Sequence, residues 1–175
     1  PATMLQRFRG ITPIIDPTAY VHPAAVLIGD VVLGPSATVW PCATLRGDDG
    51  PIRIGACSSI QDGTVIHMFE GRSITTVGER VTVGHNVTLH GCTVHDETII
   101  GMGAIVLDNA IVESNCIVGA GTLVPPGKRI PAGSVVFGNP MRIVRSVSDA
   151  DLEFIAHSWR AYVTRGAQYL EEPGV

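Results

Sequence analysis

The feature that most constrains this chain is an aliphatic residue that recurs every six positions over most of its length. A small residue follows four places after most of them, as Ala25 follows Val21. The period is interrupted at residues 46–51 and 68–76 and then resumes. The aliphatic positions are Val21, Leu27, Leu33, Val39, Leu45, Ile54, Ile60, Ile66, Val77, Val83, Leu89, Val94, Ile100, Val106, Val112, Val118 and Val124.

A six-residue unit is too short for a helical repeat but suits one short strand and one corner. We therefore predict an all-β solenoid, in which each strand pairs with its counterpart one coil away at a spacing of about 4.8 Å. The 20 glycines and the aromatic content of only 5% are typical of a core built from small and branched side chains. Where the step from Leu89 to Val94 is one residue short, Thr93 is the expected small residue.

A different pattern begins after the repeat ends near Gly138. Ser148 is a plausible N-cap because acidic residues follow it in the first turn. Apolar residues then recur at helical spacing, which predicts one amphipathic helix over residues 149–171. This helix must lie along the outside of the solenoid or reach a neighbouring subunit. We expect a solenoid domain over residues 1–145 and a C-terminal helix packed on it over residues 146–175. The helical apolar positions are Leu152, Ile155, Trp159, Tyr162 and Val163.

Charge and hydropathy exclude several classes of function. The formal net charge is −4 and no run of like charges is present, so nucleic acid is not an expected partner. The apolar runs are far shorter than the roughly 20 residues of a membrane helix, and the first ten residues have no apolar segment of a secretory signal. Four cysteines without C-x-x-C pairing predict buried thiols in a reducing cytoplasm. They are Cys42, Cys57, Cys92 and Cys116.

The period also places side chains relative to one another. Three units make one triangular coil, so the units that start at Leu45, Ile66 and Leu89 lie on one face of successive coils. Arg46, His67 and His90 each follow these aliphatic residues and form a predicted stack. The Cα atoms of His67 and His90 are then about 4.8 Å apart. Two nitrogens on a tetrahedral zinc are about 3.3 Å apart, which the two imidazoles can match.

A third imidazole, His85, falls on a different face. Ile60 and Val83 stack there, which sets Asp62 beside His85 at the third position of each unit. His85 cannot easily join His67 and His90 within its own chain. If it is a ligand, it comes from an adjacent subunit, and cyclic symmetry repeats the site at every interface. The remaining histidines, His22, His95 and His157, are expected to be surface or core residues without a metal.

With these residues the sequence resembles the γ-class carbonic anhydrases, which are left-handed β-helix proteins, and it is most similar to their bacterial short-loop branch. The matching motifs are L-R-G-D at 45–48, I-Q-D-G-T-V-I-H at 60–67 and V-G-H-N-V-T-L-H-G-C at 83–92. The resemblance implies a homotrimer that interconverts CO₂ and bicarbonate, with zinc, or alternatively Fe²⁺ or Co²⁺, at each subunit interface. It implies that His67 and His90 of one chain and His85 of its neighbour bind that metal.

The resemblance also implies roles for other residues. Gln61 stands where the family orients the reacting hydroxide, Arg46 and Asp62 match an interfacial pair, and Asp48 matches a neighbouring interface acid. Glu70 follows His67 in a short loop, where longer-loop members carry a proton-shuttle glutamate.

The C-terminal helix carries one more match and one departure. Tyr162 is similar to the family's pocket-lining tyrosine, whereas Thr164 replaces an asparagine.

Two alternative functions stay open at this point. Hexapeptides and the G-N-P motif are shared with acyltransferases of the same fold, which use a histidine as general base on a CoA thioester. A non-catalytic scaffold subunit that carries a metal is the other alternative.

Overall fold

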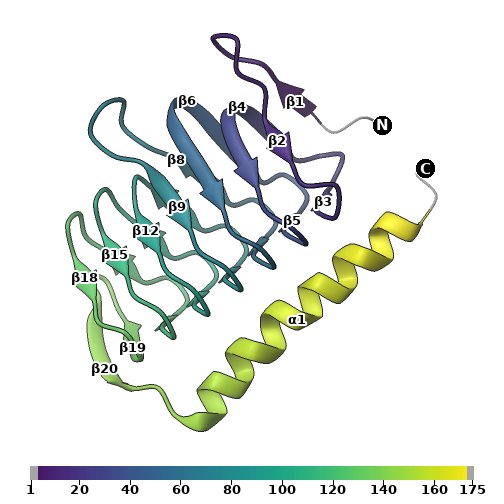
Figure 1. Ribbon diagram of the computed structural model, residues 1–175. Coiled ribbons are helices and arrows are strands. Elements are labelled where there is room, and N and C mark those ends of the chain that lie inside the picture. Colours follow the sequence, from purple (N-terminus) through teal and green to yellow (C-terminus); the bar gives the residue numbers. More distant parts are fainter. Residues whose placement is uncertain (1–3, 173–175) are drawn as a thin grey trace.

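The computed structural model describes residues 4–172, so residues 1–3 and 173–175, at the ends of the two predicted segments, lie outside the described residues. The chain winds through about seven coils of parallel strands and then forms one helix (Figure 1). The predicted left-handed β-helix of hexapeptide repeats with a C-terminal helix is confirmed. The division of the chain at residue 145 stays a prediction.

The coils build three flat faces. We name one the histidine face because it carries His67 and His90, and another the helix face because the C-terminal helix packs on it; the remaining one is the third face. The histidine face contains β1 (Met4–Gln6), the first parts of β4 (Val26–Leu33) and β6 (Thr44–Ile54), β8 (Val65–His67), β11 (Thr88–His90), β14 (Ile105–Val106) and β17 (Leu123–Val124). The third face contains β2 (Ile14–Ile15), the second parts of β4 and β6, β9 (Thr75–Val77), β12 (Thr93–Val94), β15 (Ile111–Val112) and β18 (Arg129–Ile130). The helix face contains β3 (Tyr20–Val21), β5 (Thr38–Val39), β7 (Ser59–Ile60), β10 (Thr82–Val83), β13 (Ile99–Ile100), β16 (Ile117–Val118), β19 (Ser134–Phe137) and the antiparallel β20 (Arg142–Ser146).

Successive coils pair in register, so equivalent side chains stack in columns inside the solenoid. One column consists of register partners that are all fully buried: Leu27, Leu45, Ile66, Leu89, Val106 and Val124. Burial of such branched aliphatic side chains stabilises the fold by roughly 1.5–3 kcal/mol for each residue. The aliphatic position of the repeat is therefore the core position, as the period predicts, and only the first one, Val21, is partly buried.

One detail of the predicted repeat is wrong. In the short unit, Cys92 is the fully buried small residue, whereas Thr93 is partly exposed and pairs with Thr76 in β12. Because this unit is one residue short, its inward-pointing small residue comes three positions after Leu89 instead of four, and this residue is Cys92.

The helix α1 (Asp149–Glu171) has the predicted bounds. Its N-cap is Ser148, whose hydroxyl accepts a hydrogen bond from the Asp151 N–H while the Asp151 carboxylate accepts one from the Ser148 N–H. This reciprocal capping satisfies two backbone donors that a helix start leaves unpaired. Within residues 4–172, no helix combines the length and hydrophobicity that a bilayer crossing requires.

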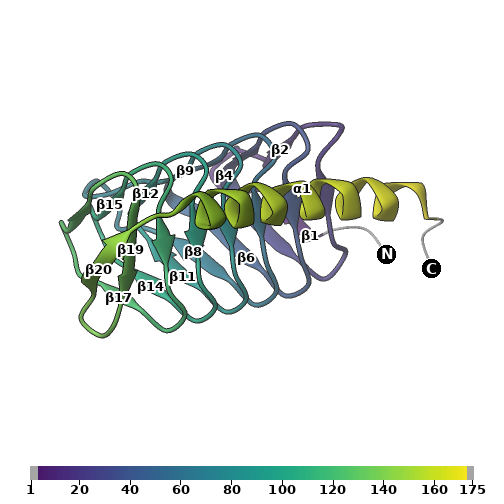
Figure 2. The same ribbon diagram turned by 90° about the horizontal axis from the view of Figure 1, so that it is seen from below.

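The helix α1 runs back along the helix face of its own solenoid (Figure 2). The ring of Trp40 packs against Tyr162 and Tyr169, with centroid distances of 5.7 and 5.4 Å. Gly166 is buried against Thr38, where a Cβ would lie 2.5 Å from the threonine methyl group. The glycine lets the helix approach the sheet closely enough for these aromatic contacts.

Close stacking of the corners predicts that Gly55 does not tolerate a side chain. A Cβ on Gly55 would lie 2.3 Å from the carbonyl oxygen of Gly78 in the next coil, and this oxygen already accepts the Ser58 hydroxyl. We expect Gly55→Ala to lower the free energy of unfolding by about 3 kcal/mol, at the upper end for overpacking. Urea denaturation followed by circular dichroism measures this change.

Gly121→Ala is the matched control, because Gly121 has a left-handed φ of 66° but a Cβ added there would meet no heavy atom within 4 Å. Its expected loss is about 1 kcal/mol, from backbone strain alone. Equal losses in the two variants would contradict the close-stacking account.

Candidate metal centre

Two imidazoles stack where β8 and β11 end, at the edge of the histidine face. His67 and His90 are register partners in these strands, so their predicted stacking is confirmed. Their side chains are only 12% and 22% exposed. Nδ1 of His67 lies 3.3 Å from Nε2 of His90, which matches the separation of about 3.3 Å between two nitrogens on one tetrahedral zinc.

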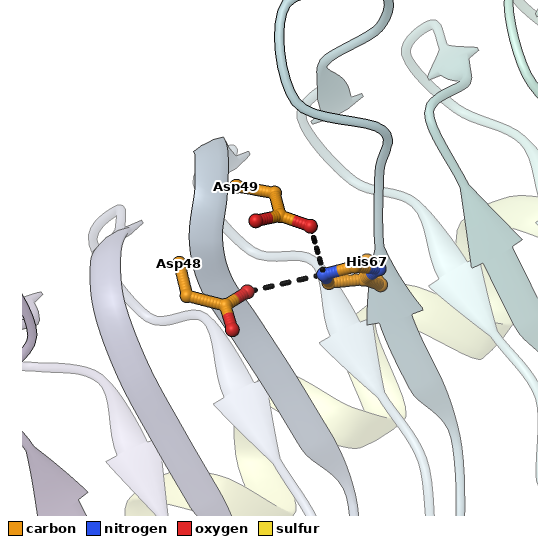
Figure 3. A group of neighbouring side chains, drawn as sticks. All are labelled: Asp48, Asp49 and His67. Atoms are coloured by element: carbon orange, nitrogen blue, oxygen red, sulfur yellow. Dashed lines mark hydrogen bonds and ion pairs between the residues drawn. The ribbon is translucent and has the colours of Figure 1, made fainter.

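The opposite nitrogens of both rings face carboxylates. Nε2 of His67 lies 3.0 Å from Oδ1 of Asp48 and 3.4 Å from Oδ2 of Asp49 (Figure 3). Nδ1 of His90 lies 2.8 Å from Oδ2 of Asp108. A neutral imidazole that donates its N–H to a carboxylate keeps its lone pair on the other nitrogen. The two lone pairs then face each other, an arrangement that a cation between the rings would satisfy.

The carboxylates beside these rings favour their ionised form. Burial raises the pKa of Asp48, but hydrogen bonds from Arg46 and His67 and the charge of Arg46 lower it by more, so the pKa lies below the ordinary aspartate value. Nη1 of Arg46 lies 2.7 Å from Oδ2 of Asp48. For Asp108, burial again raises the pKa, and hydrogen bonds from Ser73 and His90 lower it by more. Anionic partners make the remaining imidazole nitrogens better metal ligands.

His85 lies at the other edge of the histidine face, in the corner between β10 and β11. Its Nδ1 is 2.9 Å from Oδ2 of Asp62, so Nε2 is the nitrogen left to bind a metal. His85 and Asn86 form the corner turn, where Asn86 has a left-handed φ of 55°, and β11 then carries the chain across the histidine face to His90. This stretch of strand separates the two rings, whereas two nitrogens on one zinc lie about 3.3 Å apart. The prediction that the two residues lie on different faces is corrected, because His85 lies in the corner turn after β10 and His90 is the last residue of β11, so they stand at opposite edges of one face.

The other predicted site residues divide between the same two edges. Gln61, which is 4% exposed, adjoins Asp62 in the His85 corner. Tyr162 faces this corner from α1: burial raises its pKa, the charge of Arg165 lowers it by less, and the charge of Asp62 adds a still smaller increase. Arg46 bonds to Asp48 and Asp62 bonds to His85 within the chain, so the predicted pairing of Arg46 with Asp62 across an interface stays a prediction. We define two half-sites: the His67 half-site with His90, Arg46, Asp48 and Glu70, and the His85 half-site with Asp62, Gln61 and Tyr162.

Loop 68–74 borders the His67 half-site. Phe69 sets its ring edge-on to His90, with a centroid distance of 5.0 Å and an interplanar angle of 76°. Glu70 extends into solvent, where its carboxylate lies 3.0 Å from Nη1 of Arg9, and both side chains are about two-thirds exposed. The loop thus brings an apolar ring against His90 and carries an exposed carboxylate at the next residue.

A second arrangement of metal ligands is available in the same half-site. Oxygens of Asp48 and Asp49 and a nitrogen of His67 all lie within 4.8 Å of one another (Figure 3). Among residues 4–172, it is the one group of three His, Cys, Asp or Glu side chains whose ligand atoms lie this close together within a single chain. Two carboxylates suit harder cations such as Mn²⁺, whereas imidazoles suit zinc and Fe²⁺.

Sequence reasoning missed Asp49, Asp108 and Ser73. Asp108 lies one coil beyond Gly91, whose carbonyl oxygen accepts the N–H of Asn109. Extending the His67–His90 stack by one further coil reaches Leu107, because Val106 pairs with Leu89, and Asp108 is the next residue along the chain. Ser73 lies in a break of the repeat, where the period carries no information.

Comparison with known proteins places this arrangement in a family. A family model described as bacterial transferase hexapeptide (six repeats) matches residues 91–126. The carnitine operon protein CaiE of Escherichia coli is 40% identical over 147 residues, which are 84% of this chain and 74% of CaiE. The mitochondrial γ carbonic anhydrase 1 of Arabidopsis thaliana is 43% identical over 155 residues. This chain belongs to the hexapeptide-repeat family of γ carbonic anhydrase and CaiE homologues.

Coverage differs between these relatives. The matched region includes 86% of this chain but only 56% of the plant protein. A solved structure of a hexapeptide transferase family protein from Anaplasma phagocytophilum is 34% identical, has a TM-score of 0.91, and covers 95% of this chain and 98% of its own. Nearly all of this chain thus has the same fold as that protein.

Proposed function

We propose that this protein is a metal-dependent carbonic anhydrase whose active sites form between subunits of a homotrimer. The observation that carries the proposal is the placement of the two half-sites at opposite edges of one face. The His67 half-site offers two facing nitrogens 3.3 Å apart, and the His85 half-site offers a third imidazole nitrogen backed by Asp62. Joining the edges of neighbouring copies would complete a three-imidazole site.

The donor set fits a zinc ion, with Fe²⁺ or Co²⁺ as alternatives. His67, His90 and the partner subunit's His85 would hold the ion. A metal bound by three neutral imidazoles would supply a water of lowered pKa as the nucleophile for CO₂. Asp48, Asp108 and Asp62 each accept from the far nitrogen of one ring and so orient the ligands.

Other residues of the chain would assist the reaction. Phe69, beside His90, gives the site an apolar wall that suits a small uncharged substrate such as CO₂. Gln61 and Tyr162 of the His85 half-site would position the nucleophile and line the pocket. Glu70, whose carboxylate is exposed, would pass a proton between the site and solvent.

The surface of the histidine face supports association. Its outward-pointing column of register partners includes Met4, Val65 and Ile105, which are 59%, 43% and 40% exposed in the single chain, with Thr44 and Thr88 between them. The helix face is already covered by α1. Exposed apolar side chains between two half-sites favour an interface between copies at this face.

A cytoplasmic location is also proposed, because the four cysteines are free thiols and reducing conditions keep thiols unpaired. The prediction that all four are buried is wrong for Cys42, which is exposed, and for Cys57, which is partly exposed.

A hexapeptide acyltransferase is the second candidate, because the matching family model and the Anaplasma phagocytophilum protein both carry the transferase name. It predicts saturable binding of acetyl-CoA, which isothermal titration measures. A non-catalytic, metal-bearing scaffold predicts full metal occupancy without CO₂ hydration.

The first test removes one ligand. We expect His90→Ala to lower the bound zinc severalfold and to abolish CO₂ hydration, because only one ligand of the facing pair remains. Elemental analysis and stopped-flow hydration assays of anaerobically prepared protein measure the two effects. His157→Ala, on the exposed surface of α1, is the control and should change neither. Unaltered hydration in a metal-free His90→Ala protein would refute the proposal.

The second test asks whether one site uses two chains. His85→Ala and His90→Ala should each be inactive alone. When the two variants are co-expressed in equal amounts, random assembly pairs an intact His67 half-site with an intact His85 half-site at about a quarter of the interfaces. Hydration should therefore recover to about a quarter of the wild-type rate. No recovery in mixed trimers would mean that each site lies within one chain.

A further inference from the structure

Asp108 belongs to a closed cycle of contacts that joins His90 to loop 68–74. Oδ2 of Asp108 accepts from Nδ1 of His90 at 2.8 Å. Oδ1 of Asp108 accepts from the Ser73 hydroxyl at 2.6 Å. The Ser73 oxygen in turn accepts from the N–H of Phe69 at 3.1 Å, and the ring of Phe69 returns to His90 with a centroid distance of 5.0 Å.

The two oxygens of one carboxylate therefore serve two different tasks. One oxygen orients the imidazole of His90, and the other holds the loop that lies against the same imidazole. The Asp108 side chain is 19% exposed and Ser73 is 8% exposed. Hydrogen bonds to an ionised group at such sites are stronger and more directional than exposed ones.

The backbone around this carboxylate is fixed. The carbonyl oxygen of Asp108 accepts from the N–H of Gly127 at 2.8 Å, and the N–H of Asn109 donates to Gly91 at 2.7 Å. Asp108 thus sits on the rigid solenoid, whereas Phe69 and Ser73 sit in a loop that interrupts the repeat. A carboxylate held in a fixed position can pass the effect of metal binding at His90 on to the loop.

We propose that Asp108 is a positioning residue that couples metal binding at His90 to closure of loop 68–74. This inference rests on the proposed metal site. A cation on Nε2 of His90 polarises the Nδ1–H and strengthens its bond to Asp108. The ordered carboxylate then holds Ser73, and Ser73 holds Phe69 against the metal-bound imidazole. By linkage, loop closure strengthens metal binding by the same factor.

The test compares zinc affinity and loop exchange in the full-length chain. Zinc affinity is measured by competition with a chromophoric chelator. Loop closure is measured by hydrogen–deuterium exchange of peptides that cover residues 68–74, with and without zinc. In the wild type, zinc should slow exchange in these peptides.

Two variants separate the two tasks of the carboxylate. Ser73→Ala keeps the bond between His90 and Asp108 but cuts the link to the loop, so zinc should bind and no longer slow exchange in the loop. Asp108→Asn removes the charge and leaves one acceptor oxygen, which can face the Nδ1–H of His90 while the amide NH₂ donates to the Ser73 oxygen, so the zinc Kd should rise about tenfold while the loop still responds. Asp108→Ala should both weaken zinc binding and abolish the zinc response of the loop. If this variant does not fold, Ser73→Ala and Asp108→Asn suffice for the test.

Two controls exclude a merely structural effect. Thr75→Val removes a hydroxyl that donates to the His67 carbonyl oxygen at 2.7 Å and accepts from the N–H of Gly91. It should destabilise the fold yet leave the zinc response of the loop in place. Asp96→Asn alters a carboxylate that accepts the N–H of Glu79 and should leave the zinc Kd unchanged.

The outcomes separate this inference from the proposed function. A zinc-dependent slowing of loop exchange that persists in Ser73→Ala, or a zinc Kd that is unchanged in both Asp108 variants, would overturn the coupling while the metal site stands. Zinc binding that is insensitive to His90→Ala would overturn the metal site itself and the coupling with it.

Discussion

Parallel pairing between β8 and β11 is the interaction on which the candidate site depends. It places His67 directly beside His90, and the stacked columns of aliphatic side chains beneath them prevent either strand from sliding. A shift of one residue would turn Ile66 and Leu89 out of the core, where both are fully buried. The same burial that stabilises the solenoid therefore holds two imidazole nitrogens 3.3 Å apart.

The solenoid also explains why the site would need a second subunit. A strand of a β-helix runs from one corner to the next, so residues at its two ends cannot meet. His85 stands at the start of this path and His90 at its end, and each ring is backed by its own carboxylate. One chain prepares two complementary halves, and the exposed apolar surface between them gives copies a reason to associate.

Much of this structure could be predicted from the sequence, because a strict period converts sequence spacing into spatial neighbours. The six-residue period predicted the solenoid and the His67–His90 stack, and the N-cap at Ser148 predicted the start of α1. Prediction failed where the period is interrupted. The short unit put Cys92 rather than Thr93 in the core. The contacts of loop 68–74 with Asp108 depend on side chains in a break of the repeat, which no spacing rule reaches.

The most direct test of a metal shared between subunits is anomalous X-ray diffraction at the zinc absorption edge, on crystals of zinc-loaded protein. The account predicts one peak at each interface, bound by Nδ1 of His67, Nε2 of His90 and His85 of the partner subunit. A peak bound instead by Asp48, Asp49 and Nε2 of His67 within a single chain would contradict it.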